Sequence, residues 1–276
     1  MGKRLLAIFA HPDDAEIVCA GTLSLLHKAG WEVHIATMTM GDKGSAEHTR
    51  EEISRMRTAE ARNSAQVINA TYHCLEFDDV YISYDRDSLN KTTALVRKVA
   101  PSLVFTHSPA DYMVDHEMTS RIVQTACFAG GVKLMEVGEK HFEPVPHLIY
   151  CDPLEGKDIF GHPIQPSFYV DITQEIGIKA KMLACHESQR NWLLAHHKVD
   201  EYILAMKRFA EQRGQEINVE YAEGFRQHLG HSYPQDNIYD QDSTEEEFVK
   251  KLEEMEKTSS GKAMTVEELE EWFDKL

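Results

Sequence analysis

The chain has 276 residues, of which 42% are apolar and 9% aromatic, a composition that supports a folded core and excludes a disordered or collagen-like protein. Its 29 basic and 46 acidic side chains give a formal net charge of −17, which argues against a surface that binds nucleic acid or an anionic membrane. The five cysteines form no CxxC pair and no apolar run reaches the length of a membrane span, so we expect a cytoplasmic protein with free thiols.

The first half of the chain alternates short apolar runs with segments of helical periodicity. The run Leu5–Ala10 predicts a buried strand, and apolar positions from Ile17 onward predict a helix that ends at Gly30. The same patterns then predict the strands 33–40, 71–77 and 102–107 and the helices 51–68 and 88–99. Strands that alternate with helices at this period indicate βαβ units, so we predict an α/β fold: a Rossmann-like open, mostly parallel sheet with helices on both faces.

The second half of the chain is less regular. Its patterns predict helices over 115–128, 174–188 and 199–214, and strands over 147–151 and 168–171. From Ser232 to the end there are 14 acidic and 5 basic residues, and two capping-box patterns predict two short amphipathic helices. We therefore predict a domain over 1–231 and an acidic helical extension over 232–276. The apolar stripe of this extension is expected to pack on the same subunit or a neighbour, and it consists of Leu269, Trp272, Phe273 and Leu276.

Two predicted strand ends carry a high density of polar side chains. His11-Pro12-Asp13-Asp14-Ala15-Glu16 follows the first strand, and the segment from His107 to His116 follows the strand 102–107. Because the carboxyl ends of parallel strands meet at one edge of a sheet, these loops should lie together, and their carboxylates repel one another unless a cation is present. A His, an Asp and a second His would leave one coordination position open, as in catalytic zinc sites. The alternative is that Asp13 or Asp14 only caps the following helix.

The segment Ala10–Glu16, followed by Ala20-Gly21-Thr22-Leu23, resembles the opening motif of the PIG-L/LmbE-like deacetylases, zinc hydrolases that remove acetyl from N-acetylglucosaminyl groups. Further matches extend the resemblance over about residues 4–230, namely Arg57-x-x-Glu60, Asp115-His116, His186-x-Ser188-Gln189 and Tyr221-Ala222-Glu223-Gly224-Phe225-Arg226.

The resemblance implies a role for several residues at the strand ends. His11, Asp14 and His116 would bind the metal, either zinc or ferrous iron, and Asp13 would be the general base that takes a proton from water. Arg57 matches a position that contacts substrate hydroxyls. The alternative for Arg57 is a surface side chain paired with Glu60 one turn further on.

One position departs from the family pattern. Members of the family commonly have a His three residues before the second metal His, where it stabilises the oxyanion and is oriented by the following Asp. Here Met113 takes that position, and because a thioether cannot donate a hydrogen bond, Asp115 is expected to lack its usual partner. We expect a substitute catalytic donor, His186 or Tyr112 ahead of His107. The alternative is that Met113 only packs the substrate pocket, against a more apolar substrate.

These features predict a metal-dependent N-deacetylase that uses metal-activated water on a small N-acetylated amino-sugar derivative. Two alternatives stay open: an amidase that acts on a larger conjugate through the same metal site, and a Rossmann-like protein that binds a metal or ligand without turnover. A nucleotide is disfavoured because the first loop lacks G-x-G-x-x-G and its carboxylates repel phosphate. The expected partners are a small-molecule substrate and further copies of the chain in a homo-oligomer.

Overall fold

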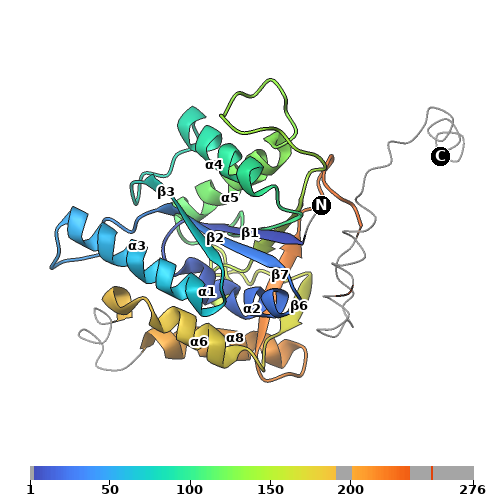
Figure 1. The fold of residues 1–276 in the computed structure, drawn as a ribbon. Coiled ribbons are helices and arrows are strands. Elements are labelled where there is room, and N and C mark those ends of the chain that lie inside the picture. Colours follow the sequence, from blue (N-terminus) through green and yellow to red (C-terminus); the bar gives the residue numbers. More distant parts are fainter. Residues whose placement is uncertain (1–2, 191–200, 237–249, 251–276) are drawn as a thin grey trace, which may run out of the picture.

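The computed structural model of the chain describes residues 3–190, 201–236 and 250. Seven strands form one sheet in the order β3-β2-β1-β4-β5-β7-β6 (Figure 1). The first five strands in this order are parallel, whereas β7 is antiparallel to both of its neighbours. The strands are β1 (Arg4–Phe9), β2 (Glu32–Thr39), β3 (Thr71–Phe77), β4 (Leu103–Thr106), β5 (His147–Cys151), β6 (Phe168–Asp171) and β7 (Ala222–Gln227).

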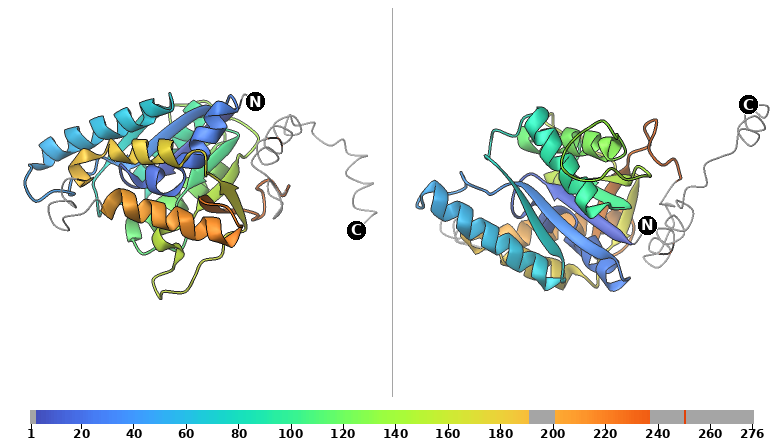
Figure 2. Two further views of the ribbon diagram at one scale, coloured as in Figure 1. Left: turned by 90° about the horizontal axis from the view of Figure 1, so that it is seen from below. Right: turned by 45° about the horizontal axis from the view of Figure 1, so that its top comes forward.

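Helices cover both faces of this sheet (Figures 1 and 2). Helices α4 and α5 pack together on one face, and α1, α2, α3 and α6 lie on the other, where α8 packs against α6. The predicted fold class, an open and mostly parallel sheet between two helical layers, is confirmed. The helices are α1 (Asp14–Val18), α2 (Ala20–Lys28), α3 (Arg50–Val67), α4 (Arg86–Val99), α5 (Val114–Ala129), the 3₁₀ turn η1 (Leu154–Gly156), α6 (Ile176–Ala184) and α8 (Glu201–Glu216).

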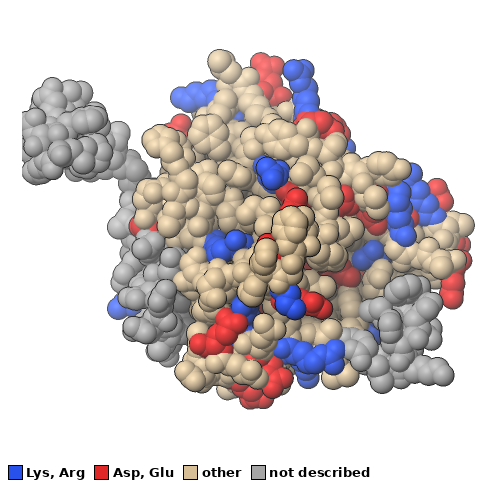
Figure 3. Space-filling model, turned by 180° about the vertical axis from the view of Figure 1, so that it is seen from behind, with Lys and Arg blue, Asp and Glu red and all other residues tan. Residues whose placement is uncertain are grey.

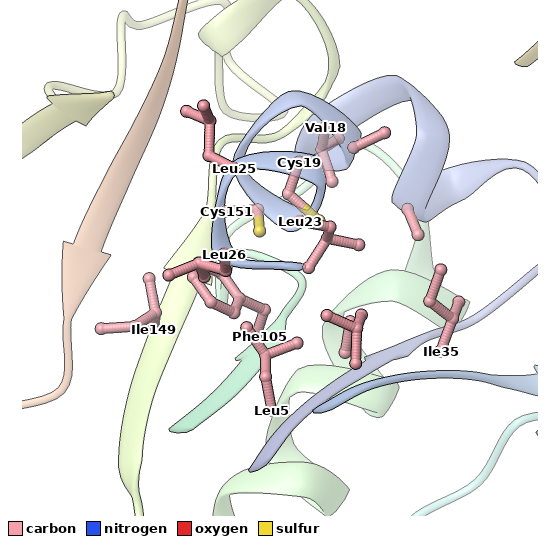
Figure 4. Packing of buried hydrophobic residues seen from close by; sticks show 14 of the residues in the cluster. Leu5, Val18, Cys19, Leu23, Leu25, Leu26, Ile35, Phe105, Ile149 and Cys151 are labelled. Atoms are coloured by element: carbon pink, nitrogen blue, oxygen red, sulfur yellow. The ribbon is translucent and has the colours of Figure 1, made fainter. Parts of the chain in front are cut away.

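Strand β1 lies in the middle of the sheet and is buried on both faces. Leu5 and Phe9 belong to the apolar cluster beneath α1 and α2, and Leu5 lies near Leu26 and Phe105 in Figure 4. Leu6 and Ile8 point to the opposite face, into the cluster formed with α4 and α5. Because successive side chains of a strand face opposite sides, only a continuous apolar run can fill both clusters. The run Leu5–Ala10 therefore places β1 centrally, and its end positions the first polar loop.

The segment after this loop differs from the prediction. The expected single helix from Ile17 to Gly30 is two helices, because Cys19 has φ −147° and ψ 8° and interrupts the helical path. The first N–H groups of α2 are bonded instead by Glu223 of β7, which accepts from Gly21 N at 2.9 Å and Thr22 N at 2.8 Å. The helix periodicity of the apolar residues is kept across this break, which is why the pattern did not reveal it.

Strand β7 was not predicted as a strand. Its sequence, from Ala222 to Gln227, contains two charged residues and lacks apolar alternation, yet four of its residues in a row are buried. The burial of the Glu223 carboxylate in this strand is tolerated because it forms an ion pair of 2.6 Å with Lys179, which is also buried. A strand whose polar residues are neutralised by distant partners has no periodic signal in its own sequence.

The far end of the chain is described only in part. Predicted helix 199–214 corresponds to α8, described from Glu201 onward, and the two helices predicted beyond residue 243 lie outside the described residues apart from Lys250. The first residues of the predicted extension pack on the body: Tyr233 is buried in the cluster formed with α4 and α5, and Asp236 lies 3.1 Å from His147. The domain boundary after residue 231 stays a prediction.

The surface of the described body carries charges of both signs. On the face shown in Figure 3, basic and acidic side chains of the described residues are interspersed, and the basic ones form no continuous patch. Among the described helices, none combines the length and the apolar character that a membrane crossing requires.

Candidate metal centre

The two polar loops meet at the carboxyl ends of β1 and β4, which are neighbours in the sheet. The turn after β1 supplies His11 and Asp14, and the first turn of α5 supplies His116. All three side chains are buried, and one ligand atom from each lies within 4.8 Å of the other two. The structure thus brings together the three residues expected to bind a metal.

The geometry of this group leaves one nitrogen of each histidine facing Asp14. His11 Nδ1 lies 3.3 Å from Asp14 Oδ2, and His116 Nε2 lies 3.5 Å from Asp14 Oδ1. The other nitrogens contact carboxylates: His11 Nε2 is 3.2 Å from Asp115 Oδ2, and His116 Nδ1 is 2.9 Å from Asp111 Oδ1. Carboxylates that hold the outer nitrogen of a histidine are typical of metal sites, where they fix the tautomer and the ring orientation. The donor set fits a divalent cation.

Asp115 was expected to lack its usual partner, but the structure provides one in His11. Asp115 Oδ2 accepts a hydrogen bond from the backbone N–H of Val80 at 2.7 Å as well. Asp111 was not singled out by the sequence as a functional residue. Its role depends on the turn that precedes α5, where its Oδ1 also accepts the N–H of Met113 at 3.1 Å.

The charges at this centre favour a cation. Burial alone would raise the pKa of Asp14, but the charge of His116 and a hydrogen bond from His11 lower it well below its ordinary value. Burial would lower the pKa of His11, yet its bonds to Asp115 and Asp14 raise that pKa to about 9. Burial would also lower the pKa of His116, but the charge of Asp14 and the hydrogen bond to Asp111 raise it to about 10. Without a metal the histidines hold protons that balance the carboxylates, and a bound cation would displace these protons.

Asp13 lies beside this group but has a different environment. It stands at the N-cap position of α1 with φ 102°, and its side chain makes no capping hydrogen bond, so the alternative of a helix cap is wrong for this residue. Its Oδ2 lies 3.4 Å from Arg57 Nη2 and accepts a hydrogen bond from the hydroxyl of Tyr202. Burial raises the pKa of Asp13, although the charge of Arg57 opposes this shift.

A cavity of about 540 Å³ opens over these residues. Its wall includes the three candidate ligands and Asp13, and it includes the residues predicted to contact substrate, which are Arg57, Tyr112 and Met113. Volumes of this size are common for small-molecule sites. The metal group and the predicted substrate residues therefore share one cavity.

Arg57 is buried in the wall of this cavity and is not a surface residue. Its Nη2 donates to the backbone carbonyl of Pro12 at 2.8 Å, and its side chain passes so close to Gly41 that a Cβ there would lie 2.5 Å from Cδ. Glu60 instead accepts hydrogen bonds from the backbone and hydroxyl of Ser188. The alternative of an exposed Arg57 paired with Glu60 is wrong.

The three candidates for a substitute donor lie in different places. Tyr112 is on the cavity wall, whereas His186 and His107 are buried outside it. His186 Nε2 lies 3.4 Å from Glu16, and His107 Nε2 accepts the N–H of Ala10 at 3.0 Å. Burial and the charge of His116 lower the pKa of His107 to about 4, so this ring stays neutral and its Nε2 has no proton to donate.

Sequence reasoning missed Tyr202, whose hydroxyl reaches Asp13 from α8. It lies 86 residues beyond His116 on a helix with no motif of its own, so no local pattern could reveal it. Burial, together with the charge of Asp13, raises the pKa of the Tyr202 hydroxyl well above its ordinary value, which keeps it protonated near neutral pH.

Comparison with known proteins is consistent with this geometry. Diacetylchitobiose deacetylase of Thermococcus kodakarensis is 27% identical over 194 residues, which is 68% of this chain and 70% of that protein. 4-Oxalmesaconate hydratase of Pseudomonas putida is 24% identical over 243 residues, 81% of this chain and 88% of that protein. Relatives of this kind therefore include both a deacetylase and a hydratase.

Solved structures show the same fold. N,N′-diacetylchitobiose deacetylase from Pyrococcus horikoshii has a TM-score of 0.72 at 24% identity, covering 84% of this chain and 87% of that chain. The 4-carboxy-2-hydroxymuconate hydratase from Pseudomonas putida has a TM-score of 0.70 at 22% identity, covering 86% of this chain and 100% of that chain. The family profile described as "PIG-L: GlcNAc-PI de-N-acetylase" matches residues 6–127, a stretch that holds all three candidate metal ligands. Over these residues the chain matches the PIG-L family profile, as its sequence motifs led us to expect.

Proposed function

We propose that this protein is a metal-dependent hydrolase that removes the acetyl group from a small N-acetylated amino-sugar derivative. The observation that carries the proposal is the position of Asp13, a carboxylate whose side chain is 13% exposed and whose pKa is raised, beside the His11, Asp14 and His116 group in the wall of one cavity. The family match and the deacetylases among the relatives support the same reaction.

The proposed metal is zinc, with ferrous iron as the alternative, because two imidazoles and one carboxylate suit both ions. A divalent metal held by these residues supplies the Lewis acidity that lowers the pKa of water and polarises an amide carbonyl. The five cysteines are free thiols, which supports the proposed cytoplasmic location.

The remaining roles in the proposed reaction are proton transfer, substrate binding and orientation of the two histidines, and each falls to residues of the chain. Asp13 accepts a proton from the attacking water and delivers it to the departing amine, and its raised pKa suits a group that must do both. Arg57 keeps Asp13 in place and presents its guanidinium to substrate hydroxyls. Asp115 and Asp111 hold the two histidines in the orientation that leaves one nitrogen of each free for the metal.

A hydrogen-bond donor for the developing oxyanion is needed because Met113 cannot supply one. Among the described residues, Tyr112 and Tyr202 are the hydroxyl-bearing side chains that line the cavity. We propose that one of them takes this role, and their pKa values, raised by burial, keep both protonated. Replacing each by Phe identifies the donor, since losing one oxyanion donor typically lowers kcat about 10²–10³-fold. If both variants keep the parent rate with metal bound, the proposed donor is wrong.

Elemental analysis of the purified protein, followed by acetate release from N-acetylglucosamine and its glycosides, tests the proposed function. Metal-dependent acetate release supports it, and bound metal without acetate release from any N-acetyl substrate contradicts it. Activity confined to larger acylated conjugates would favour the amidase alternative. Metal binding without any turnover would favour a binding protein.

A hydratase is the second candidate, because the hydratase relative is covered over 88% of its length and Met113 removes a family donor here. The reaction would add water to a carbon–carbon double bond, with Asp13 again accepting the proton. Loss of the ultraviolet absorbance of 4-oxalmesaconate on incubation with the protein, without acetate release from N-acetyl sugars, would replace the deacetylase proposal.

A further inference from the structure

A reciprocal pair of hydrogen bonds connects two loops at the carboxyl edge of the sheet. Asp42 follows β2 and Asp79 follows β3, two strands that are neighbours in the sheet. Asp42 Oδ1 accepts the backbone N–H of Asp79 at 2.7 Å, and Asp79 Oδ2 accepts the backbone N–H of Lys43 at 3.1 Å. Each loop thus supplies a carboxylate that binds the backbone of the other, and we call this pair of contacts the loop clamp.

The carboxylate of Asp42 is buried, and both of its oxygens have partners. Its Oδ2 lies 2.6 Å from Arg50 Nε and accepts a hydrogen bond from Lys43 Nζ at 2.9 Å, and these two cations are partly exposed. Hydrogen bonds between charged groups are among the strong ones in proteins. The two cations therefore fix the carboxylate in the orientation that turns its other oxygen to the backbone of Asp79.

The residue that follows the clamp contacts the candidate metal centre. The backbone N–H of Val80 donates to Asp115 Oδ2 at 2.7 Å, and the same oxygen lies 3.2 Å from His11 Nε2. Two consecutive N–H groups are thus bound by carboxylates from different parts of the chain, that of Asp79 by Asp42 and that of Val80 by Asp115. A continuous path of contacts leads from Asp42 to the ring of His11.

Val80 has a backbone conformation that needs support from its surroundings. Its φ is +71°, in the left-handed region that β-branched residues rarely adopt. A residue in such a conformation persists only where the structure around it holds it there. Without the clamp, the segment can return to a conformation of lower energy, which moves the Val80 N–H away from Asp115. The contact with the metal centre therefore depends on Asp42.

We propose that Asp42 is a positioning residue of the metal centre: through the backbone of Asp79 and Val80 it keeps Asp115 where it orients the ring of His11. This inference rests on the metal centre of the proposed function and not on its substrate. Asp42 is not among the described residues that line the cavity, so a substitution there reaches the metal only through other residues. The alternative is that the clamp only joins two loops and contributes to stability alone.

Zinc affinity, measured by competition with a fluorescent chelator, tests this role. Asp42→Ala should bind zinc about three- to tenfold more weakly, less than the roughly 10–100-fold loss typical of removing a group that contacts the ligand itself. Asp42→Asn keeps an oxygen for the Asp79 N–H and should bind zinc nearly as tightly as the parent, although it loses the ion pairs with Arg50 and Lys43. Unchanged affinity in Asp42→Ala, or equal losses in both variants, would overturn the inference.

A matched control separates positioning from a general loss of stability. Asp85 lies in the same connection between β3 and α4, where its Oδ1 accepts the N–H of Ser88 at 3.0 Å and caps α4. Asp85→Ala should be less stable than the parent because it loses this cap, yet it should bind zinc as the parent does. A loss of affinity in Asp85→Ala as large as that in Asp42→Ala would contradict the proposed role.

A double-variant cycle tests the path of contacts. If Asp42 acts through Asp115, Asp42→Ala should cause no further loss of zinc affinity in a chain that already carries Asp115→Ala, because substitutions along one path do not add. Losses that add in the double variant would show that Asp42 acts by another route, and the inference would be wrong.

Hydrogen exchange of the Val80 amide gives a second measurement, which requires neither metal nor substrate. Exchange should be faster in Asp42→Ala than in the parent and should keep the parent rate in Asp42→Asn and Asp85→Ala. A parent rate in Asp42→Ala would overturn the inference. Absence of acetate release from every N-acetyl sugar would overturn the proposed reaction alone, since exchange and zinc affinity are measured without a substrate.

Discussion

Asp13 and Asp14 are neighbours in the chain, yet their surroundings move their pKa values in opposite directions. Burial raises the pKa of Asp13, which lies beside a guanidinium of Arg57 that also donates to the Pro12 carbonyl. The imidazoles around Asp14 lower its pKa by more than burial raises it, so Asp14 stays ionised. Two carboxylates with pKa values pushed apart are typical of an active site that needs one base and one permanent anion.

The first prediction follows for Asp13. Asp13→Asn should keep the metal, because His11, Asp14 and His116 remain, and should lower kcat by about 10²–10⁴-fold, the usual loss for a general base. Metal content and acetate release are measured on the same preparation. Full activity in this variant would show that another group takes the proton.

Asp111 supports the second prediction because it holds the outer nitrogen of His116. Asp111→Asn should weaken metal binding by about 10–100-fold, as removal of such a supporting carboxylate typically does. Competition with a fluorescent chelator measures the affinity. Asp87→Asn, at a carboxylate whose side chain is 69% exposed on α4, is the matched control and should bind metal as the parent does. An unchanged affinity in Asp111→Asn would mean that His116 needs no support.

Among the elements, β7 connects parts of the fold that lie far apart in the sequence. Glu223 accepts hydrogen bonds from the start of α2 and forms an ion pair of 2.6 Å with Lys179 of α6. This contact gives the motif from Tyr221 to Arg226 a structural role beside the metal motifs: it fixes the start of α2, the second helix after the metal loop.

The third prediction concerns this ion pair. Glu223→Gln should lower the free energy of unfolding by about 3–5 kcal/mol, because it leaves the buried ammonium of Lys179 without a counter-charge. Adding Lys179→Met should recover much of the loss, since an apolar side chain then replaces the uncompensated charge. Denaturant unfolding of the two single variants and the double variant measures this, and a double variant that is less stable than Glu223→Gln would contradict it.

A histidine pair joins strands β2 and β3 at the edge of the sheet. His34 Nδ1 lies 3.0 Å from His73 Nε2, a contact that requires at least one neutral ring. Burial, with the charge of His34, lowers the pKa of His73 from 6.5 to about 4. The unfolded chain therefore binds more protons between these values, so this pair's contribution to stability is full above about pH 6.5 and is lost as the pH falls toward 4.

The fourth prediction is that His73→Gln reduces the loss of stability on acidification. The difference in unfolding free energy between pH 7.5 and pH 5 should be smaller in this variant than in the parent. His162→Gln, at a histidine whose side chain is 77% exposed, serves as the control and should behave as the parent. Equal acid sensitivity of the parent and His73→Gln would exclude the pair as the cause.

At the scale of the whole molecule, the acidic extension begins inside the packed body. Tyr233 is 7% exposed, and its hydroxyl donates to the backbone carbonyl of Gln124 on α5, so the chain is still part of the core after residue 231. Asp236 is the last residue of the described segment 201–236, and its side chain lies 3.1 Å from His147.

The fifth prediction compares two truncations of this extension. Ending the chain after Ser232 removes Tyr233 and should destabilise the body by about 3 kcal/mol or more, the usual loss for a buried aromatic side chain. Ending it after Asp236 keeps these contacts, and any further change in melting temperature or oligomer size then reports on the predicted stripe around Trp272. Equal melting temperatures for the two truncated chains would show that Tyr233 contributes nothing.

The sequence alone predicted the parallel sheet, the position of β1 and the meeting of the two polar loops, and the resemblance of its motifs to a known family implied His11, Asp14 and His116 as metal residues. The sheet and the meeting of the loops follow from local signals: a continuous apolar run marks a strand buried on both faces, and polar residues directly after two such strands must meet at one sheet edge. Such signals need only the spacing of residues within a loop or element, which the sequence contains in full.

Only the tertiary structure revealed β7, the pairing of Asp111 and Asp115 with the metal histidines, and the approach of Tyr202 to Asp13. Each of these features depends on a contact between segments that are far apart in the chain, and such contacts leave no repeating pattern in the sequence. The histidine pairings also depend on which ring nitrogen faces which carboxylate. Val80 shows the same limit: its left-handed backbone and the hydrogen bond from its N–H to Asp115 are features that no pattern of side chains encodes. Burial and long-range pairing, rather than residue type, decided the chemistry of these positions.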